Sequence, residues 1–459
     1  MDTGKAPMLQ KIMTNTKSIC SSLCLLSLMG FPSVGAFGQT TFQLNPVALP
    51  SAEAWLETEV QVAKARINLA ISQPDTERGV VIASPSRTSP NYYYHWVRDG
   101  ALTMDVVASL LASGDTSGPW QQKLLDYAKF SRQNQMANSI TGLGEPKFQV
   151  DGTPFAGPWG RPQNDGPALR ALTFLHFAQI LLQNGQAQYV RTTLYDGASP
   201  SQSLIKADLD YVAAHWADPS FDLWEEVKGT HFFTRMVQRK ALLAGASLAQ
   251  SLGYQGDSDW YLRQAQAIAA DLPNFWNASA GYIGATRNYV AGLGSKASNL
   301  DIAVVLGVIH GSVDDGVFDF DDQRVRLSVN ALIEKFGSLY SINHVSAFPA
   351  EATGRYPEDV YDGANFQGGN PWVLSTLAIA EAFYATAEAA KSDPGLGVDP
   401  ATLLAQGDLY VQRVALHANP DGTLSEQIDR NSGYMVSANN LTWNYSSVLR
   451  TYWARQRAQ

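Results

Sequence analysis

The sequence predicts an all-α protein in which six helical hairpins close into a ring of inner and outer helices, an (α/α)6 barrel. Three observations lead to this fold class. Long segments whose apolar residues recur at helical spacing follow one another from about residue 50 to the C-terminal end. Helix-breaking residues separate these segments. Apart from short pieces such as residues 79–83, little of the sequence has the pattern of a β-strand.

Twelve helical segments are expected, with boundaries defined to about two to four residues. In chain order they cover residues 52–72, 99–113, 119–136, 166–183, 201–215, 231–252, 257–275, 299–310, 321–339, 371–390, 402–418 and 438–455. Several packings satisfy this count. A superhelical solenoid requires self-similarity at a fixed period, which the sequence lacks. A toroid of inner and outer helices buries one face of each helix and brings alternate loops to one end.

The composition is that of a well-buried globular protein, because hydrophobic residues make up 45% and charged residues 16% of the 459 residues. The formal net charge of −9 argues against nucleic acid and anionic membranes as partners, since both require basic patches. A neutral polymer or a small polar substrate fits better. The 11 Trp, 19 Tyr and 18 Phe residues offer flat rings that suit the apolar faces of sugars, although a large core also uses such residues.

Residues 1–36 are expected to be a signal peptide, which predicts a secreted or periplasmic protein. Three lysines, Lys5, Lys11 and Lys17, precede an apolar run over residues 19–34. The small residues at 33–36 suit cleavage. A membrane anchor is the alternative, but the apolar run contains serines, Gly30 and Pro32 and is short for a span.

The predicted mature chain, residues 37–459, contains no cysteine, because both Cys20 and Cys24 lie in the leader. It therefore has neither disulfides nor a thiol nucleophile. No linker rich in Gly, Pro or Ser follows the leader, so a single domain is expected. No exposed apolar repeat requires a partner subunit, and a monomer is the expected state.

The most informative stretch covers residues 221–227, where Glu225 and Glu226 stand between apolar and aromatic neighbours. Such surroundings favour the neutral form of a carboxylic acid and raise its pKa, which suits a general acid. Adjacent side chains on an extended segment point to opposite sides, so the two glutamates are expected to have different tasks. The alternative is an ordinary helix start, with Asp222 as N-cap and Glu225 as its capping-box partner.

Four other clusters of polar and aromatic residues lie between the predicted helices. Together with residues 221–227, all of them follow odd-numbered helices and are expected to meet at one end of the toroid. Their chemical groups are carboxylates, guanidiniums and rings, at Asp99, Glu145, Glu225, Glu226, Asp359, Glu426, Arg98, Arg355, Trp96, Trp159 and Tyr361. This inventory suits glycosidic bond cleavage, in which one carboxylic acid protonates the leaving oxygen and a carboxylate activates water or attacks.

Other chemistries fit less well. The seven histidines form no paired metal-ligand motif, so neither a metal nor another cofactor is expected. His95 is expected to hydrogen-bond or pack beside its aromatic neighbours. Asp99 has the alternative role of capping the helix that it precedes. The Gly-x-Ser-x-Gly elbow of serine hydrolases is missing from the sequence.

Eight motifs resemble, in the same order, those of the glucoamylase family, glycoside hydrolase family fifteen. They are YYYHWVRD (92–99), GLGEPKF (142–148), WGRPQ (159–163), DLWEEV (222–227), GRYPED (354–359), GNPW (369–372), SEQ (425–427) and LTW (441–443). The resemblance spans most of residues 50–459. It implies an (α/α)6 barrel that releases glucose units, with inversion, from the non-reducing ends of starch and maltooligosaccharides, and more slowly from α-1,6 bonds.

The same resemblance implies roles for individual residues. Glu225 matches the general acid, Glu426 the general base, and Ser437 a hydroxyl that hydrogen-bonds the base. Glu226 matches a residue that holds a sugar at the neighbouring site. Substrate binding is expected at Tyr92, Trp96, Arg98, Asp99, Trp159, Glu226, Arg355, Asp359, Tyr361, Trp372 and Trp443.

The sequence departs from the familiar secreted members of that family. It lacks their disulfides, and it ends after the last predicted helix, so no starch-binding domain is expected. The loop over residues 362–369 is longer than usual, which leaves the outer sugar subsites undefined. Two alternatives remain open: the same barrel acting on isomaltose, dextran or trehalose, and a non-catalytic glucan-binding protein.

Overall fold

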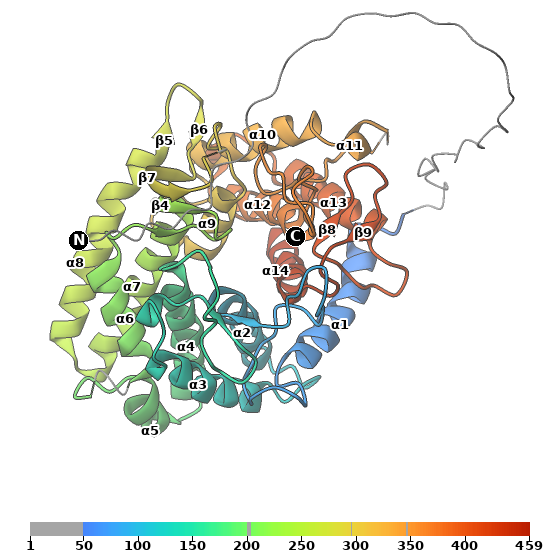
Figure 1. The fold of residues 1–459 in the computed structure, drawn as a ribbon. Coiled ribbons are helices and arrows are strands. Elements are labelled where there is room, and N and C mark those ends of the chain that lie inside the picture. Colours follow the sequence, from blue (N-terminus) through green and yellow to red (C-terminus); the bar gives the residue numbers. More distant parts are fainter. Residues whose placement is uncertain (1–48, 200–202, 295, 346–347) are drawn as a thin grey trace, which may run out of the picture. The chain divides into compact units, whose positions relative to one another are not determined.

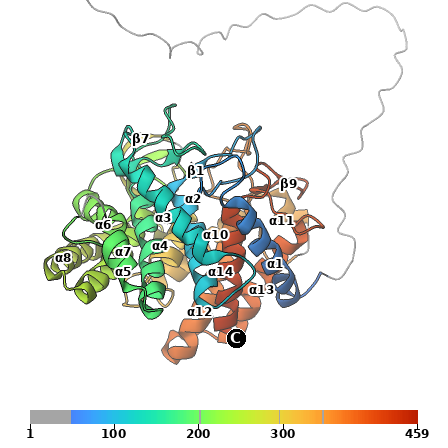
Figure 2. The same ribbon diagram turned by 90° about the horizontal axis from the view of Figure 1, so that it is seen from below.

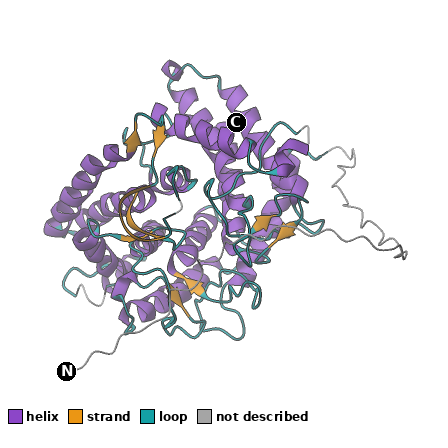
Figure 3. Cartoon of the chain, turned by 45° about the horizontal axis from the view of Figure 1, so that its top comes forward, coloured by secondary structure: helices purple, strands orange, loops and turns teal. Residues whose placement is uncertain are grey.

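The computed structural model describes residues 49–199, 203–294, 296–345 and 348–459. The predicted leader and both cysteines lie outside the described residues. Helices make up most of the described chain, and the strands are short (Figures 1 and 3). The all-α prediction is confirmed.

Six helices form the inner ring of the barrel: α2 (Val97–Ala112), α4 (Asp165–Gln183), α7 (Phe232–Leu252), α9 (Ala303–Gly311), α12 (Val373–Ser392) and α14 (Thr442–Ala458). Each contacts the next, and α14 closes the ring against α2. Six outer helices pack around them: α1 (Ala52–Ala70), α3 (Trp120–Met136), α6 (Leu204–His215), α8 (Gln255–Asp271), α10 (Gln323–Gly337) and α13 (Pro400–His417). These are the twelve predicted helices, so the (α/α)6 barrel is also confirmed.

Burial distinguishes the two rings. On the outer helix α8 the buried positions are Ser258, Tyr261, Ala265 and Ile268, which is the single apolar stripe of an amphipathic helix. The inner helix α9, in contrast, is buried at every residue from Ala303 to Gly311, because other helices cover all its sides. Even so, none of the described helices is long and apolar enough to cross a bilayer.

The strands form small antiparallel sheets in the loops. The largest contains β3 (Ser220–Phe221), β4 (Val227–His231) and β7 (Thr286–Gly292). Three pairs complete the set: β1 (His95–Trp96) with β2 (Lys147–Phe148), β5 (Trp276–Asn277) with β6 (Tyr282–Ile283), and β8 (Gln427–Ile428) with β9 (Met435–Val436). The strand expected at residues 79–83 is wrong, because only Val81 bridges there, to Ile71.

Short helical turns complete the described elements: α5 (Ala187–Tyr189), η1 (Gly142–Gly144), η2 (Val190–Leu194), η4 (Leu272–Phe275), α11 (Ser341–Val345) and η5 (Pro394–Leu396). In Figure 2, strands β1, β7 and β9 lie at the same end of the helices. The loops that precede the inner helices therefore gather at one end of the barrel, as the sequence predicts.

Candidate active site

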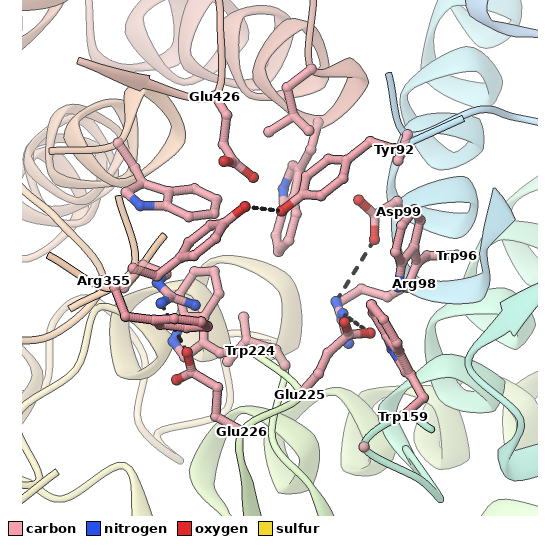
Figure 4. A pocket seen from close by; sticks show the side chains of 18 residues that line it. Tyr92, Trp96, Arg98, Asp99, Trp159, Trp224, Glu225, Glu226, Arg355 and Glu426 are labelled. Atoms are coloured by element: carbon pink, nitrogen blue, oxygen red, sulfur yellow. Dashed lines mark hydrogen bonds and ion pairs between the residues drawn. The ribbon is translucent and has the colours of Figure 1, made fainter. Parts of the chain in front are cut away.

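Residues 221–227 form the turn of the β3–β4 hairpin. The carboxylate of Asp222 closes the turn by accepting hydrogen bonds from the backbone N–H groups of Glu226 (2.7 Å) and Val227 (3.0 Å). Glu225 adopts a left-handed backbone conformation with φ of 68°, which costs a non-glycine residue about 1 kcal/mol. The helix start considered as an alternative is therefore wrong. In the turn, the side chains of Glu225 and Glu226 diverge (Figure 4), as expected for adjacent residues outside a helix.

A cavity of about 360 Å³ lies where the loops meet. Twelve of the fourteen residues expected to catalyse, to bind substrate or to support the base line this cavity: Tyr92, Trp96, Arg98, Asp99, Trp159, Glu225, Glu226, Arg355, Tyr361, Trp372, Glu426 and Trp443. Asp359 and Ser437 do not line it. Lining residues that were not singled out from the sequence are Ala83, Gly160, Leu223, Trp224, Phe366 and Leu441.

Arg98 organises one wall of the cavity. Its Nη1 donates to Asp165 Oδ2 at 2.9 Å, and its Nη2 lies 3.5 Å from Glu225 Oε1. Gln163 connects the two residues, because it accepts from Arg98 Nη1 at 2.9 Å and donates to Glu225 Oε1 at 3.0 Å. These buried contacts hold the Glu225 carboxylate in one orientation beside the guanidinium.

Asp99 and two tryptophans complete this wall (Figure 4). Burial raises the pKa of Asp99 to about 6, although the nearby Arg98 cation opposes the change. The distance of 3.9 Å from Arg98 Nε to Asp99 Oδ2 is too long for a hydrogen bond. The rings of Trp96 and Trp159 lie 6.0 Å apart and give the wall a flat apolar surface.

Arg355 organises the opposite wall. Its guanidinium donates to Glu226 Oε1 at 2.9 Å and to both oxygens of Asp359 at 2.8 and 2.7 Å. Tyr356 donates its hydroxyl to the other Glu226 oxygen at 2.8 Å. Asp359, which the resemblance suggested as a substrate contact, thus lies behind Arg355 and holds it in place.

Lys296 was not among the site residues predicted from the sequence. In the structure it connects three carboxylates beneath this wall. Its Nζ lies 2.7 Å from Asp222, 3.2 Å from Glu226 and 3.4 Å from Asp301. Burial opposes ionisation of Asp222, but Lys296 outweighs it and lowers the pKa of Asp222 to about 2. Lys296 lies in the loop after the seventh predicted helix. That position could have revealed it, because every other cluster also follows an odd-numbered helix.

Replacing Lys296 by Met is expected to lower the free energy of unfolding by about 3 kcal/mol, because it leaves buried carboxylates without their cation. Urea unfolding followed by far-UV circular dichroism measures this change. Lys129→Met on the exposed face of α3 is the matched control, with an expected change within about 0.5 kcal/mol. Equal stabilities for the two variants would contradict the role assigned to Lys296.

Glu426 lies between these two walls and across the cavity from Glu225 (Figure 4), immediately before β8. The antiparallel pairing of Gln427 with Val436 brings Glu426 and Ser437 side by side at the end of the β8–β9 hairpin. Ser437 Oγ donates to Glu426 Oε2 at 2.5 Å, and Gln427 Nε2 donates to the same oxygen at 3.1 Å. Glu426 is only 1% exposed, and this burial raises its pKa to about 7 despite the hydrogen bond from Ser437.

Besides Asp359, two more residues of the predicted clusters do not reach the cavity. Glu145 is buried in an ion pair with Arg161 at 2.9 Å. His95 lies 3.0 Å from the carbonyl oxygen of Val81 and packs edge-on against Phe130, which confirms the hydrogen-bonding and packing role expected for it. Among the described residues, no group of three or more His, Asp or Glu side chains is placed to hold a metal ion.

Glu225 and Glu426 face each other from opposite sides of the open space, and aromatic rings line the walls between them (Figure 4). A pair of carboxyl groups placed on both sides of a bound sugar is what cleavage of a glycosidic bond requires. On a helical barrel, this arrangement defines a glycoside hydrolase.

Comparison with known proteins identifies the family. A family model described as glycosyl hydrolases family 15 matches residues 61–403 and 396–453. Glucoamylase from Blastobotrys adeninivorans is 37% identical over 443 residues, which cover 87% of this chain and 71% of that protein. Glucoamylase 1 from Rhizopus oryzae is 34% identical, with 90% of this chain and 72% of that protein covered. The chain belongs to glycosyl hydrolases family 15.

Solved structures agree with this assignment. A glucoamylase from Saccharomycopsis fibuligera matches with a TM-score of 0.80 and 28% identity, covering 92% of this chain and 98% of that one. A family 15 glucoamylase from Hypocrea jecorina matches with a TM-score of 0.79 and 31% identity, covering 88% of this chain and 72% of that one. The resemblance seen in the sequence motifs is therefore confirmed at the level of family and fold.

Proposed function

We propose that this glycoside hydrolase removes single β-D-glucose units from the non-reducing ends of α-1,4-glucans such as starch and maltooligosaccharides, and acts more slowly on α-1,6 bonds. The observation that carries the proposal is the placement of Glu225 and Glu426 on opposite sides of the cavity (Figure 4). The relatives reported above are named glucoamylases, and these names support the same substrate class.

In the proposed mechanism, Glu225 donates a proton to the glycosidic oxygen as the bond to the leaving sugar breaks. Glu426 takes a proton from a water molecule, which attacks the anomeric carbon from the other face and inverts its configuration. Arg98 and Gln163 hold Glu225, and Ser437 and Gln427 hold Glu426. Neither carboxyl group then has to reorient during the reaction.

The remaining polar groups are assigned to binding the substrate, with Asp99 and Arg355 at the terminal glucose and Glu226 at the neighbouring sugar. Asp99 can accept substrate hydroxyls, since its contact with Arg98 is too long for a hydrogen bond. Arg355 and Glu226 offer donors and acceptors on the opposite wall. A cavity of about 360 Å³ is the size of a small-molecule site rather than a groove for a polymer, which favours action at chain ends.

Incubation of the protein with maltotetraose, followed within seconds by optical rotation and product analysis, tests the proposal. The expected result is β-glucose, released one unit at a time. Release of α-glucose would contradict the assigned roles of acid and base. If maltotetraose were left intact while trehalose or isomaltose was cut, the proposed linkage would be wrong. Binding of maltotetraose without cleavage of any of these sugars would favour a glucan-binding protein.

Replacing Ser437 by Ala is expected to shift the acidic limb of the kcat/KM profile to higher pH by about one unit. Ser437 donates to the ionised form of Glu426 and so lowers its pKa, and removing that donor raises the pKa. A base with a higher pKa is protonated, and inactive, up to a higher pH. Initial rates on maltose from pH 3 to pH 8 measure the shift. A profile that falls in height but keeps its pH dependence would contradict this role.

A further inference from the structure

The loop over residues 362–369 is anchored at both ends beside the active site. At its start, the Asp362 carboxylate accepts from the backbone N–H of Ala364 at 3.0 Å. At its end, the N–H of Gly368 donates to Val360 O at 3.0 Å, and the N–H of Gly369 donates to Asp359 O at 2.7 Å. These bonds give the loop a defined base and leave its tip, which carries Phe366, outside them.

Three aromatic rings lead from the interior of the cavity to this tip. Trp372, only 5% exposed, lies 6.5 Å from Tyr361, and Tyr361 lies 6.1 Å from Phe366. Phe366 is 72% exposed, yet it still contributes to the lining of the cavity. The burial of successive rings therefore decreases outward, and Phe366 is the ring at the solvent side of this wall.

An exposed phenyl ring at this position has no role in the proposed chemistry. Its exposure means that it contributes little to the core, and it lacks a polar atom that could orient a hydroxyl. What it offers is a flat apolar face of the kind that packs against the apolar face of a sugar. Arg355, Glu226 and Asp99 supply the polar contacts deeper in the cavity.

We propose that Phe366 forms a binding surface for the third and later sugar units of the substrate, so that the loop over residues 362–369 makes the enzyme prefer longer glucans to maltose. The proposal rests on the proposed function, because it concerns the chain that extends from the same active site. A packing contact of this kind adds affinity for longer chains and leaves the choice of linkage to the polar groups deeper in the cavity.

The base of the loop has a second role, because it also contacts the residues that support the proposed base. This role decides which variant can test the proposal. Gly363 O accepts a hydrogen bond from Tyr361 at 3.1 Å and lies 3.5 Å from Ser437 Oγ, the donor to Glu426. Deleting the loop would therefore also disturb the support of the proposed base. A substitution at the exposed tip separates the two effects.

The test compares kcat/KM on maltose, maltotriose, maltotetraose and maltoheptaose for the wild type, Phe366→Ala and Phe366→Trp. Phe366→Ala is expected to lower the ratio of kcat/KM on maltoheptaose to that on maltose by about three- to tenfold, the range for one aromatic contact. Phe366→Trp keeps a flat ring and is expected to retain the ratio. The control is Met136→Ala, since Met136 is 71% exposed and does not line the cavity.

Thermal unfolding of each variant shows that an altered ratio does not come from misfolding, and the exposure of Phe366 predicts an unchanged Tm. The proposal would be overturned if Phe366→Ala left the ratio unchanged or lowered kcat/KM equally on maltose and maltoheptaose. Failure of the proposed function has a different signature, because the wild type itself would then cut none of the four maltooligosaccharides.

Discussion

Replacing Glu225 by Gln is expected to lower kcat on maltose by about 10²- to 10⁴-fold, the usual contribution of one general acid. Glutamine has the size of glutamate and can still meet Gln163 and Arg98, but it cannot give a proton to the leaving oxygen. Steady-state kinetics on maltose measure the loss. KM is expected to change little, because the variant keeps the shape of the cavity.

A substrate with a better leaving group shows that the loss concerns proton donation. α-D-Glucosyl fluoride releases fluoride, which needs far less protonation than a sugar hydroxyl, so Glu225→Gln is expected to lose much less activity on this substrate. Glu57→Gln on the exposed face of α1 is the matched control and should behave as the wild type. Equal losses on maltose and on the fluoride would show that Glu225 is not the acid.

Replacing Glu426 by Gln is expected to lower kcat by about 10²- to 10⁴-fold on maltose and on α-D-glucosyl fluoride alike. The attacking water must lose a proton whatever group leaves, so a better leaving group is not expected to restore kcat. Comparing the two substrates under the same conditions therefore separates a base at Glu426 from an acid at Glu225. Retention of the wild-type Tm would show that the buried site remains folded.

Added azide tests the same assignment in another way. Azide is already anionic and needs no base, so it is expected to restore turnover of α-D-glucosyl fluoride by Glu426→Gln and to form β-D-glucosyl azide. The same addition should leave Glu225→Gln unchanged on maltose, where protonation of the leaving sugar is the missing step. An α-configured azide product would indicate a covalent intermediate and contradict the inverting mechanism.

The helical barrel could be predicted because its signals are local. A helix repeats every few residues, so the stripe of Ser258, Tyr261, Ala265 and Ile268 is visible in a short window of sequence. The sheet of β3, β4 and β7 could not be predicted in this way. β4 and β7 lie more than 50 residues apart, and each strand is stable only when paired with the other.

The site was predictable in part for a related reason. Motifs identified Glu225, Glu426, Arg98, Arg355 and the aromatic residues, and the alternation of helices indicated that their loops meet at one end. Lys296 belongs to no motif. Its place after an odd-numbered helix indicates only which end of the barrel it lies at, and not that it contacts Asp222 more than 70 positions away. Likewise, Asp359 was identified as part of a motif, but only its contacts show that it holds Arg355.

The sequence by itself determined the helices, their number, and the residue types available for chemistry, because helix periodicity and composition depend on neighbours along the chain. The tertiary structure alone decided which carboxylates face each other, which are buried and which cations they meet. Glu225 and Glu426 stand about 200 positions apart in the chain and on opposite sides of one cavity in the fold. Burial and charge contacts of this kind depend on distances in space, and only the closed ring of helices sets those distances.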